Sequence, residues 1–435
     1  LILASQTDAA RQVLEQGRLR GLKGEALDVL ADRLEEASGC EPSQQEVEML
    51  LAVFAEGRYP EADPLAQAMT ENFPQYGLGW KMLGAIYKQM GRSADALAPM
   101  QKGVVLLPSD AEAHRNLGIV LGDVGRLDDA VVSYQRALEI KPDFAEALNN
   151  LAIVLIAQGK FNLALNIIKK SLQVKETAAN KGFFVGCVKH LRCMHDISEI
   201  RVDMVRALTE SWGRPSDLAR FGLDLVMHNP DIGACIARAV EAWPVRLSAQ
   251  DLFGVSSVLG LATVASDTLL CALLNSVPIC DIKMERFLTM VRRTMLEAAT
   301  RMTVSDGEVG TVLDFYAAMA RQCFINEYVY SYTDDEILKA SDLRDSMVAA
   351  LEAKTQIPAL WPVAVAAYFP LRSLPFASQL LEWQWPDAVA AVLVQQIREP
   401  EEELQLRATI PRLTNIEDDV SLLVQSQYEE NPYPR

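Results

Sequence analysis

Apolar residues recur every three or four positions along much of this chain. The stretch containing Trp80, Leu83 and Tyr87 has this spacing, and so does the stretch from Leu148 to Leu155. Such spacing places the apolar residues on one face of an α-helix. In the second half we find no convincing alternation of apolar and polar residues that would favour strands. The pattern therefore predicts an all-α protein built from amphipathic helices.

Four features repeat in phase with a period of 34 residues. A glycine is followed at once by a basic residue, an alanine stands five positions after the glycine, and a proline closes three of the four units. The glycine ends one helix in a conformation that costs other residues more, the alanine lets a second helix lie close, and the proline stops that helix. The repeated positions are Gly57, Gly91, Gly125 and Gly159; Arg58, Arg92, Arg126 and Lys160; Ala62, Ala96, Ala130 and Ala164; and Pro74, Pro108 and Pro142.

Each unit is therefore predicted to be a helical hairpin that cannot bury its apolar face alone, so that the hairpins stack into a solenoid. The unit from Gly77 to Pro108 resembles a tetratricopeptide repeat. The first unit departs from the pattern at Glu46, where an aromatic residue or leucine is usual, and the fourth has Glu176 in place of proline. The signature residues are Trp80, Leu83, Gly84, Tyr87, Ala96 and Pro108.

We expect an all-α fold in which a tetratricopeptide-repeat solenoid precedes a second all-helical region. Four repeats would occupy residues 43–176, with capping helices at 1–42. A helical domain would follow at 177–400, and residues 401–435 would form an acidic linker or tail. Prolines between residues 358 and 386 should divide the end of the helical domain into short helices and turns.

Stacked hairpins present a concave face made mainly by the first helix of each pair, and this face is the predicted groove for a protein or peptide partner. Asn116 and Asn150 stand at equivalent positions, and amides can hold an extended backbone without reading its sequence. The repeats of O-linked N-acetylglucosamine transferases are similar here, although Met82 interrupts the series. Ordinary solvated side chains are the alternative interpretation. The predicted groove residues are Lys81, Lys88, Glu112, Arg115, Asn116, Glu146, Asn149 and Asn150.

Local signals also mark individual helices outside the groove. Residues Thr7 to Ala37 read as two amphipathic helices that cap the first repeat. Capping boxes, in which a Ser or Thr is followed three residues later by an acid, predict helix starts at Ser43, Ser248 and Thr333. The apolar window from Leu252 to Leu274 is interrupted by polar residues, so we interpret it as a buried helix pair rather than a membrane span.

The charge argues against two classes of partner. The formal net charge is −17, and such a surface repels the phosphate backbone of nucleic acids. The opening residues lack the basic and apolar pattern of a signal peptide, and we expect no membrane association. Seven cysteines without a CxxC motif fit reduced thiols in a cytoplasm. The sequence leaves oligomerisation open.

Two clusters of chemically active residue types are candidates for a metal site or a catalytic site. Cys187, His190, Cys193 and His195 are ligand types for zinc, but on one helix they point in different directions, so no metal site is expected. The acids that follow Thr333 stand at a helix start, where carboxylates favour the helix dipole. No nucleophile, metallo-hydrolase or nucleotide-binding motif appears, so no catalytic residue and no bound cofactor are expected in these residues.

The end of the chain carries a second resemblance. The segment Gln427 to Arg435 (QYEENPYPR) is similar to the junction in bacterial proteins that fuse tetratricopeptide repeats to a class I methyltransferase dependent on S-adenosylmethionine. The segments 321–328 (RQCFINEY), 395–400 (QQIREP) and 410–419 are similar to the same group. The resemblance implies that the cofactor, S-adenosylmethionine, belongs to a domain beyond Arg435. The first residue, Leu1, also fits a piece of a longer protein.

Three hypotheses for the function remain open at this point. The chain could be a scaffold that recruits substrate to a methyltransferase domain absent from it. It could instead be a stand-alone adaptor whose second half supplies a dimer or partner surface. The third hypothesis is an enzyme with an unrecognised site within residues 177–400.

Overall fold

The computed structural model describes residues 41–191, 198–254, 257–301 and 310–407, together with a few isolated residues outside these ranges. The chain divides into two compact units, Leu1–Cys187 and Val188–Arg435. Every regular element of the described residues is a helix, which confirms the all-α prediction. The predicted capping helices before residue 38 and the tail from 410 to 435 lie outside the described ranges.

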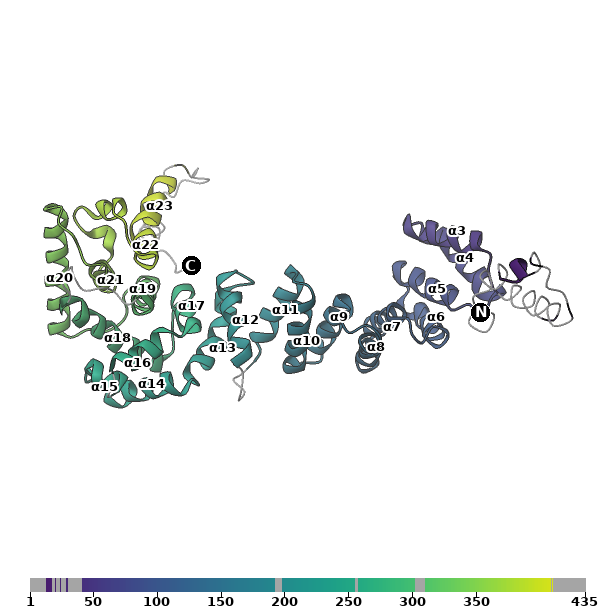
Figure 1. Cartoon of the computed structure of the whole chain (residues 1–435), viewed down its shortest axis with the longest axis horizontal. Helices are drawn as coiled ribbons and strands as arrows, with labels where there is room; N and C mark the ends of the chain where they lie inside the picture. Colours follow the sequence, from purple (N-terminus) through teal and green to yellow (C-terminus); the bar gives the residue numbers. More distant parts are fainter. Residues whose placement is uncertain are drawn as a thin grey trace, which may run out of the picture. The chain divides into compact units, whose positions relative to one another are not determined.

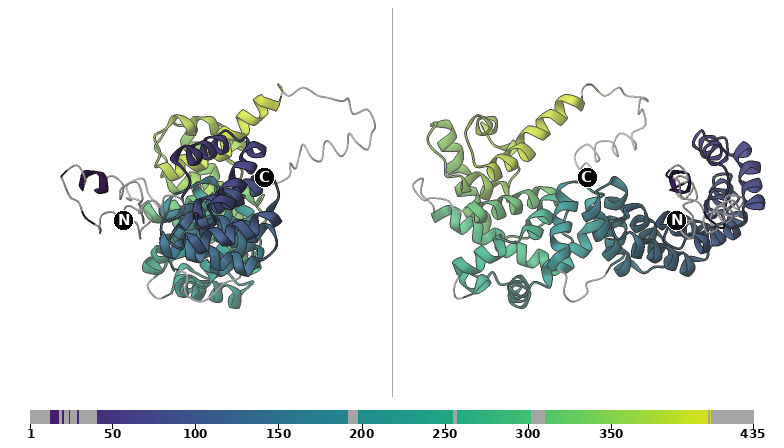
Figure 2. Two further views of the ribbon diagram at one scale, coloured as in Figure 1. Left: turned by 90° about the vertical axis from the view of Figure 1, so that its right-hand side faces the viewer. Right: turned by 45° about the vertical axis from the view of Figure 1, so that its right-hand side comes forward.

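Unit 1 is a run of helical hairpins that pack on one another in chain order (Figure 1). Figure 2 shows the same succession of blue helices from two further directions. The helices are α3 (Gln44–Ala55), α4 (Tyr59–Asn72), α5 (Gly77–Gln89), α6 (Ser93–Leu106), α7 (Ala111–Asp123), α8 (Leu127–Ile140), α9 (Ala145–Ala157), α10 (Phe161–Val174) and α11 (Ala178–Val188).

The glycine between the two helices of each hairpin has the left-handed backbone that the period predicts. Gly57, Gly91, Gly125 and Gly159 have φ between 70° and 80°. In the second hairpin, Gly91 N–H donates to Lys88 O at 3.0 Å and Arg92 N–H to Tyr87 O at 2.8 Å. These two bonds satisfy carbonyls that the end of a helix leaves unpaired. The same pair of bonds recurs in the other three hairpins, so one closure is repeated four times.

The two helices of a hairpin lie very close together. All four alanines at the repeated position are fully buried. A Cβ added at Gly84 would lie 2.6 Å from Met100 Cγ, and one added at Gly118 would lie 2.6 Å from Tyr134 Cε1. The predicted role of the small residues in the hairpin contact is therefore confirmed.

Unit 2 gathers its helices around α19. This helix contacts α16, α17, α18, α21 and α22, and most of its residues are buried. The elements are α12 (Ser198–Thr209), α13 (Pro215–Met227), α14 (Pro230–Ala242), α15 (Ala249–Phe253), α16 (Ser257–Ala265), α17 (Thr268–Ser276), α18 (Ile282–Arg301), α19 (Gly310–Ile325), α20 (Asp334–Glu352), α21 (Leu360–Ala366), η2 (Leu371–Ser373), η3 (Ala377–Glu382), α22 (Asp387–Leu393), the π-helical η4 (Val394–Arg398) and α23 (Glu399–Arg407).

The predicted helix pair within residues 252–274 is present, but its second helix is much more deeply buried than its first. Leu269, Leu270 and Leu273 of α17 are fully buried, whereas Val258 and Leu259 of α16 are largely exposed. No single helix among the described residues is long and apolar enough to cross a membrane. The pair α16 and α17 meets that test together, with a bend of 62° between its two helices.

Candidate functional site

The first helices of the hairpins form a continuous row in unit 1, because α5 contacts α7 and α7 contacts α9. We call the exposed side of α3, α5, α7 and α9 the inner face. Four residues at equivalent positions, one repeat apart, run along its middle. Leu51 and Ile153 expose 41% and 46% of their surface, and the two between them are partly exposed. The four residues, Leu51, Ala85, Ile119 and Ile153, make an apolar ladder.

A pocket of about 210 Å³ opens on this face between α3, α5 and α7. Three predicted groove residues, Lys88, Arg115 and Asn116, line it together. Arg115 Nη1 donates to Asn116 Oδ1 at 3.2 Å, while Arg115 Nε is buried and has no hydrogen-bond partner. The remaining lining residues are mostly apolar: Phe54, Ala85, Gln89, Met100 and Ile119.

Lys81 and Glu112 join two successive repeats instead of lining this pocket. Lys81 Nζ donates to Asp110 Oδ2 at 2.8 Å and to Glu112 Oε2 at 3.0 Å. Burial would lower the pKa of Lys81, but the two carboxylates outweigh it and raise the pKa above its ordinary value. The ammonium group is therefore held charged between the first helices of neighbouring hairpins.

The two neighbouring asparagines of α9 have different surroundings. Asn149 Oδ1 accepts a hydrogen bond from Ser171 Oγ of α10 at 2.7 Å. The same hydroxyl accepts one from Asn180 Nδ2 of α11 at 3.1 Å, and Asn180 is fully buried. Asn150 Nδ2 has no partner among the described residues, and Glu146 on the same helix is exposed. Asn149 therefore ties α9 to the following helices, whereas the amide nitrogen of Asn150 is buried without a partner among the described residues.

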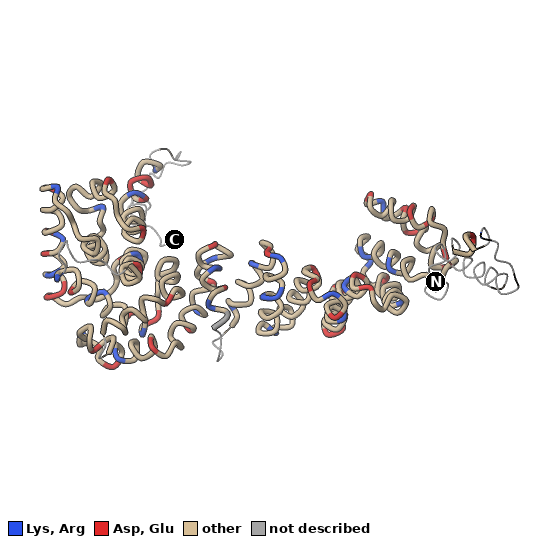
Figure 3. The backbone as a smooth tube through the Cα atoms, in the orientation of Figure 1, with Lys and Arg blue, Asp and Glu red and all other residues tan. Residues whose placement is uncertain are grey.

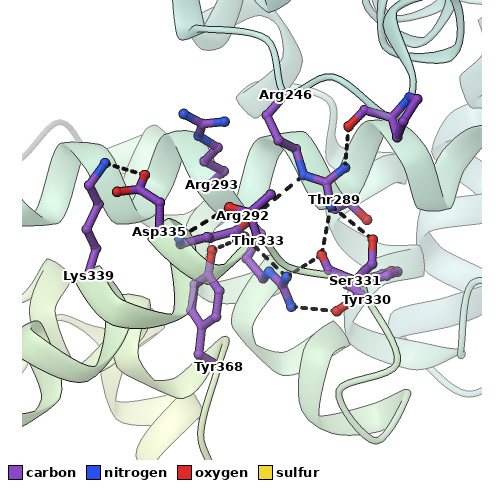
Figure 4. Close-up of polar contacts among 12 residues, drawn as sticks. Arg246, Thr289, Arg292, Arg293, Tyr330, Ser331, Thr333, Asp335, Lys339 and Tyr368 are labelled. Carbon is purple, nitrogen blue, oxygen red and sulfur yellow. Dashed lines mark hydrogen bonds and ion pairs between the residues drawn. The ribbon is translucent and has the colours of Figure 1, made fainter.

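Unit 2 contains a buried ion cluster, which we define as Arg246, Arg292, Glu336 and Tyr368 (Figure 4). The side chains of Arg292 and Glu336 are each only 1% exposed. Glu336 Oε1 accepts from Arg292 Nη2 at 3.2 Å and from Tyr368 O–H at 2.5 Å. Arg246 Nε lies 3.8 Å from the other carboxylate oxygen. Burial raises the pKa of Tyr368 well above its ordinary value, so its hydroxyl stays protonated and donates.

The two arginines of the cluster also hold the loop between α19 and α20. Arg292 donates to Tyr330 O at 3.2 Å and to Ser331 O at 2.8 Å. Arg246 Nη2 donates to Ser331 O at 3.1 Å and to Ser331 Oγ at 2.9 Å (Figure 4). The backbone carbonyl groups of this loop have no helical N–H partners, and the two guanidinium groups donate to them instead. These hydrogen bonds hold the loop against α18.

Glu336 corrects one sequence prediction. The box at Ser43 is complete, but at Thr333 only the hydroxyl caps the helix, because the Glu336 carboxylate points into the ion cluster. The acids that follow Thr333 do lie in the first turn of a helix, where Glu336 is buried and Asp335 pairs with Lys339 at 2.7 Å. A signal was present in the sequence, since Glu336 stands in helical phase with the buried Ala340 and with apolar residues further along α20.

A second buried polar centre brings together the segments 321–328 and 395–400 of unit 2. Tyr328 O–H donates to Gln396 Oε1 at 3.3 Å. Gln396 is fully buried in η4, and its amide donates to Ala366 O at 3.2 Å. The segments 321–328 and 395–400 therefore lie side by side in unit 2.

The cysteines of the described residues are free thiols, and most of them are buried. Burial raises the pKa of Cys187 to about 11 and the pKa values of Cys271 and Cys323 to about 12, so these thiols stay protonated near neutral pH. Cys193 and His195 lie outside the described residues. Within the described ranges, no group of three or more metal-ligating side chains is close enough to hold an ion.

Two family models match the chain inside unit 1. A TPR repeat model matches residues 123–159 and a tetratricopeptide repeat model matches residues 144–183. Residues 123–183 are tetratricopeptide repeats. The matches cover α8, α9, α10 and part of α11, so the repeat pattern continues past Glu176.

Solved structures of several repeat proteins are similar to part of the chain. MamA from Desulfovibrio magneticus RS-1 is 17% identical, with a TM-score of 0.30 over 39% of this chain and 94% of that chain. PilF of Pseudomonas aeruginosa is 14% identical, with a TM-score of 0.32 over 43% of this chain and 91% of that one. YrrB, described as a TPR protein with an unusual peptide-binding site, is 20% identical, with a TM-score of 0.30 over 39% of this chain and 86% of that one. No curated protein matches the chain.

Sequence reasoning missed the apolar ladder of the tetratricopeptide hairpins, although the signal for it was the same 34-residue period. The positions of Leu51, Ala85, Ile119 and Ile153 follow from that period once the first helix is placed. These four residues were not predicted as groove residues, because apolar residues on an amphipathic helix are ordinarily assigned to the core.

The two asparagines of α9 should respond differently to truncation. Asn149→Ala removes a partner from a buried hydrogen-bond chain and should lower the free energy of unfolding by about 1–2 kcal/mol. Asn150→Ala removes an amide without a protein partner and should change it by less than about 0.5 kcal/mol. Urea denaturation of the two variants measures the difference. Equal losses of stability would contradict the assignment.

Removing the carboxylate of the ion cluster should destabilise unit 2. Glu336→Gln leaves two buried guanidinium groups without a counter-charge, which should cost about 3–5 kcal/mol. Asp335→Asn is the matched control, and its exposed pair with Lys339 should be worth at most about 1 kcal/mol. Thermal unfolding followed by circular dichroism compares them. A Glu336→Gln protein as stable as the control would show that the cluster is not needed for folding.

Proposed function

We propose that the tetratricopeptide hairpins of unit 1 hold a segment of a protein partner on their inner face. The apolar ladder carries the proposal, because it places apolar side chains at a regular spacing on the first helices, and the large side chains of Leu51 and Ile153 at its two ends are exposed. The neighbouring pocket adds the unpartnered nitrogen of Arg115 and the amide of Asn116. A face that combines apolar area with a few convergent polar groups is typical of binding sites.

Both signs of charge are spread along the chain rather than separated into a single basic tract (Figure 3). With a net charge of −17, the chain as a whole repels a phosphate backbone. This distribution supports a protein partner over a nucleic acid.

Site-specific photo-crosslinking in cells that make the protein tests the inner face. A photoreactive amino acid at Ile153, on the first helix of a hairpin, should form adducts with a partner. Val132 on the second helix α8 is the matched control, since it is at least as exposed at 63% against 46% for Ile153. Adducts from Val132 as abundant as those from Ile153 would place the contact elsewhere and overturn the proposal.

We also propose that the partner is presented as a substrate to a methyltransferase domain that binds S-adenosylmethionine and follows Arg435. The support is the resemblance of segments 321–328, 395–400, 410–419 and 427–435 to the fusion proteins. The hydrogen bond between Tyr328 and Gln396 brings two of these segments into contact in unit 2.

Reading the gene beyond the codon for Arg435 tests this second proposal. We expect sequence for a strand followed by a glycine-rich turn, the arrangement that holds the cofactor in class I methyltransferases. A stop codon at that point would leave a scaffold without an attached enzyme. The peptide-binding proposal for unit 1 would be unaffected by that result.

A further inference from the structure

The pocket between α3, α5 and α7 has a chemistry that narrows the kind of segment the inner face accepts. We propose that it selects partner segments in which a large apolar side chain stands next to an aspartate or glutamate. This inference rests on the proposed function of unit 1. It differs from a clamp that holds any extended backbone, because it makes two side chains of the partner the determinants of binding.

The apolar requirement follows from the pocket wall. Met100 is almost fully buried beneath it, and Phe54, Ala85 and Ile119 supply further carbon surface. Ala85 and Ile119 are the two middle members of the apolar ladder, so the wall continues along the inner face toward Leu51 and Ile153. A leucine, isoleucine or phenylalanine side chain fits the volume of about 210 Å³ and loses its contact with water there.

The acidic requirement follows from two cations that have no carboxylate partner. Lys88 and Arg115 line the pocket, and neither forms an ion pair within the described residues. Several other basic side chains of the hairpins do have a carboxylate partner. They include Arg58, Lys81, Arg92, Arg126, Arg136 and Lys160.

The positive charges of Arg115 and Lys88 make the site favourable for an anionic acceptor. Arg115 Nη1 already donates to Asn116, and Nε is buried without a partner, so the guanidinium is held in place beside the pocket. A carboxylate from the partner can pair with this guanidinium and face the ammonium of Lys88. An amide or hydroxyl could accept the hydrogen bond but would leave the two positive charges uncompensated.

The amides of the inner face do not form the alternative backbone clamp. Asn149 Oδ1 accepts from Ser171, Asn116 Oδ1 accepts from Arg115, and the amide nitrogen of Asn150 is buried. Amide groups engaged or covered in this way are poorly placed to hold an extended chain over several residues. Selection by side chains in the pocket is therefore favoured over sequence-independent holding of a backbone.

A displayed library of random peptides of a dozen residues, panned against the full 435-residue chain, tests the inference. Clones that bind the chain but not its Lys88→Met, Arg115→Met double variant should be enriched for an apolar residue within two positions of an acid. Methionine keeps the apolar stems of both side chains and removes only the charges. Lys102→Met, on the second helix α6, is the control for loss of an exposed positive charge.

Synthetic peptides from the enriched clones then give the magnitudes by fluorescence anisotropy. Replacing the acid by its amide, or the apolar residue by serine, should each weaken binding about tenfold. Ile119→Ser should weaken binding by a similar factor, whereas Lys102→Met and Val132→Ser should leave it within about twofold. Far-ultraviolet circular dichroism of each variant excludes loss of the fold as the cause.

The outcomes separate this inference from the function on which it rests. If peptides without an apolar–acidic pair are enriched and their binding depends on Ile153 but not on Lys88 and Arg115, the inference is wrong and the inner face still binds peptides. If no peptide binds, or if binding is indifferent to every inner-face variant, both the inference and the proposed function are overturned.

Discussion

The closeness of the two helices in each hairpin determines everything else in unit 1. A fully buried alanine on the second helix lets the helices meet, Gly84 and Gly118 on the first helix of two hairpins bring them closer still, and a left-handed glycine lies in the short turn between the two helices of every hairpin. Because the closure is the same each time, the first helices come to lie side by side. The residues that face away from this contact then align along the inner face, one repeat apart, without any separate feature to position them.

This repeated geometry is also what made unit 1 predictable from the sequence. The glycine, the alanine and the helical spacing are local signals, and each was sufficient to predict its part of the hairpin. The side-chain partners of α9 were not predictable in the same way. Asn149 and Asn150 are neighbours in the sequence, and which of them meets α10 depends on the rotation of a packed helix. Asn149 is engaged by Ser171, which in turn accepts a hydrogen bond from Asn180, and both of these residues belong to later helices.

Unit 2 shows the same limit at a larger scale. Thr333 correctly predicts a helix start, but the sequence near it says nothing about where the carboxylate of Glu336 goes. That carboxylate is drawn into the core by Arg246 and Arg292, which come from segments far earlier in the chain. The arginines are there because the loop before α20 buries carbonyl groups that have no helical donors. Glu336 then compensates the charge that those donors bring with them.

Charge acts on the inner face over two distances with opposite effects. The chain as a whole is strongly acidic, but at physiological salt its repulsion of an acidic partner is largely screened beyond roughly 8 Å, so this charge acts only weakly on a distant partner. Inside that distance Lys88 and Arg115 face the partner directly, and the attraction of two uncompensated cations prevails. Electrostatic steering therefore does not assist the encounter, and affinity must arise from slow dissociation once the apolar side chain is seated. Added salt would reduce the repulsion between the acidic chain and its partner, and it would also weaken the ion pairs with Lys88 and Arg115. Because these two effects oppose each other, the affinity should fall less steeply with salt than it would if only two ion pairs were formed.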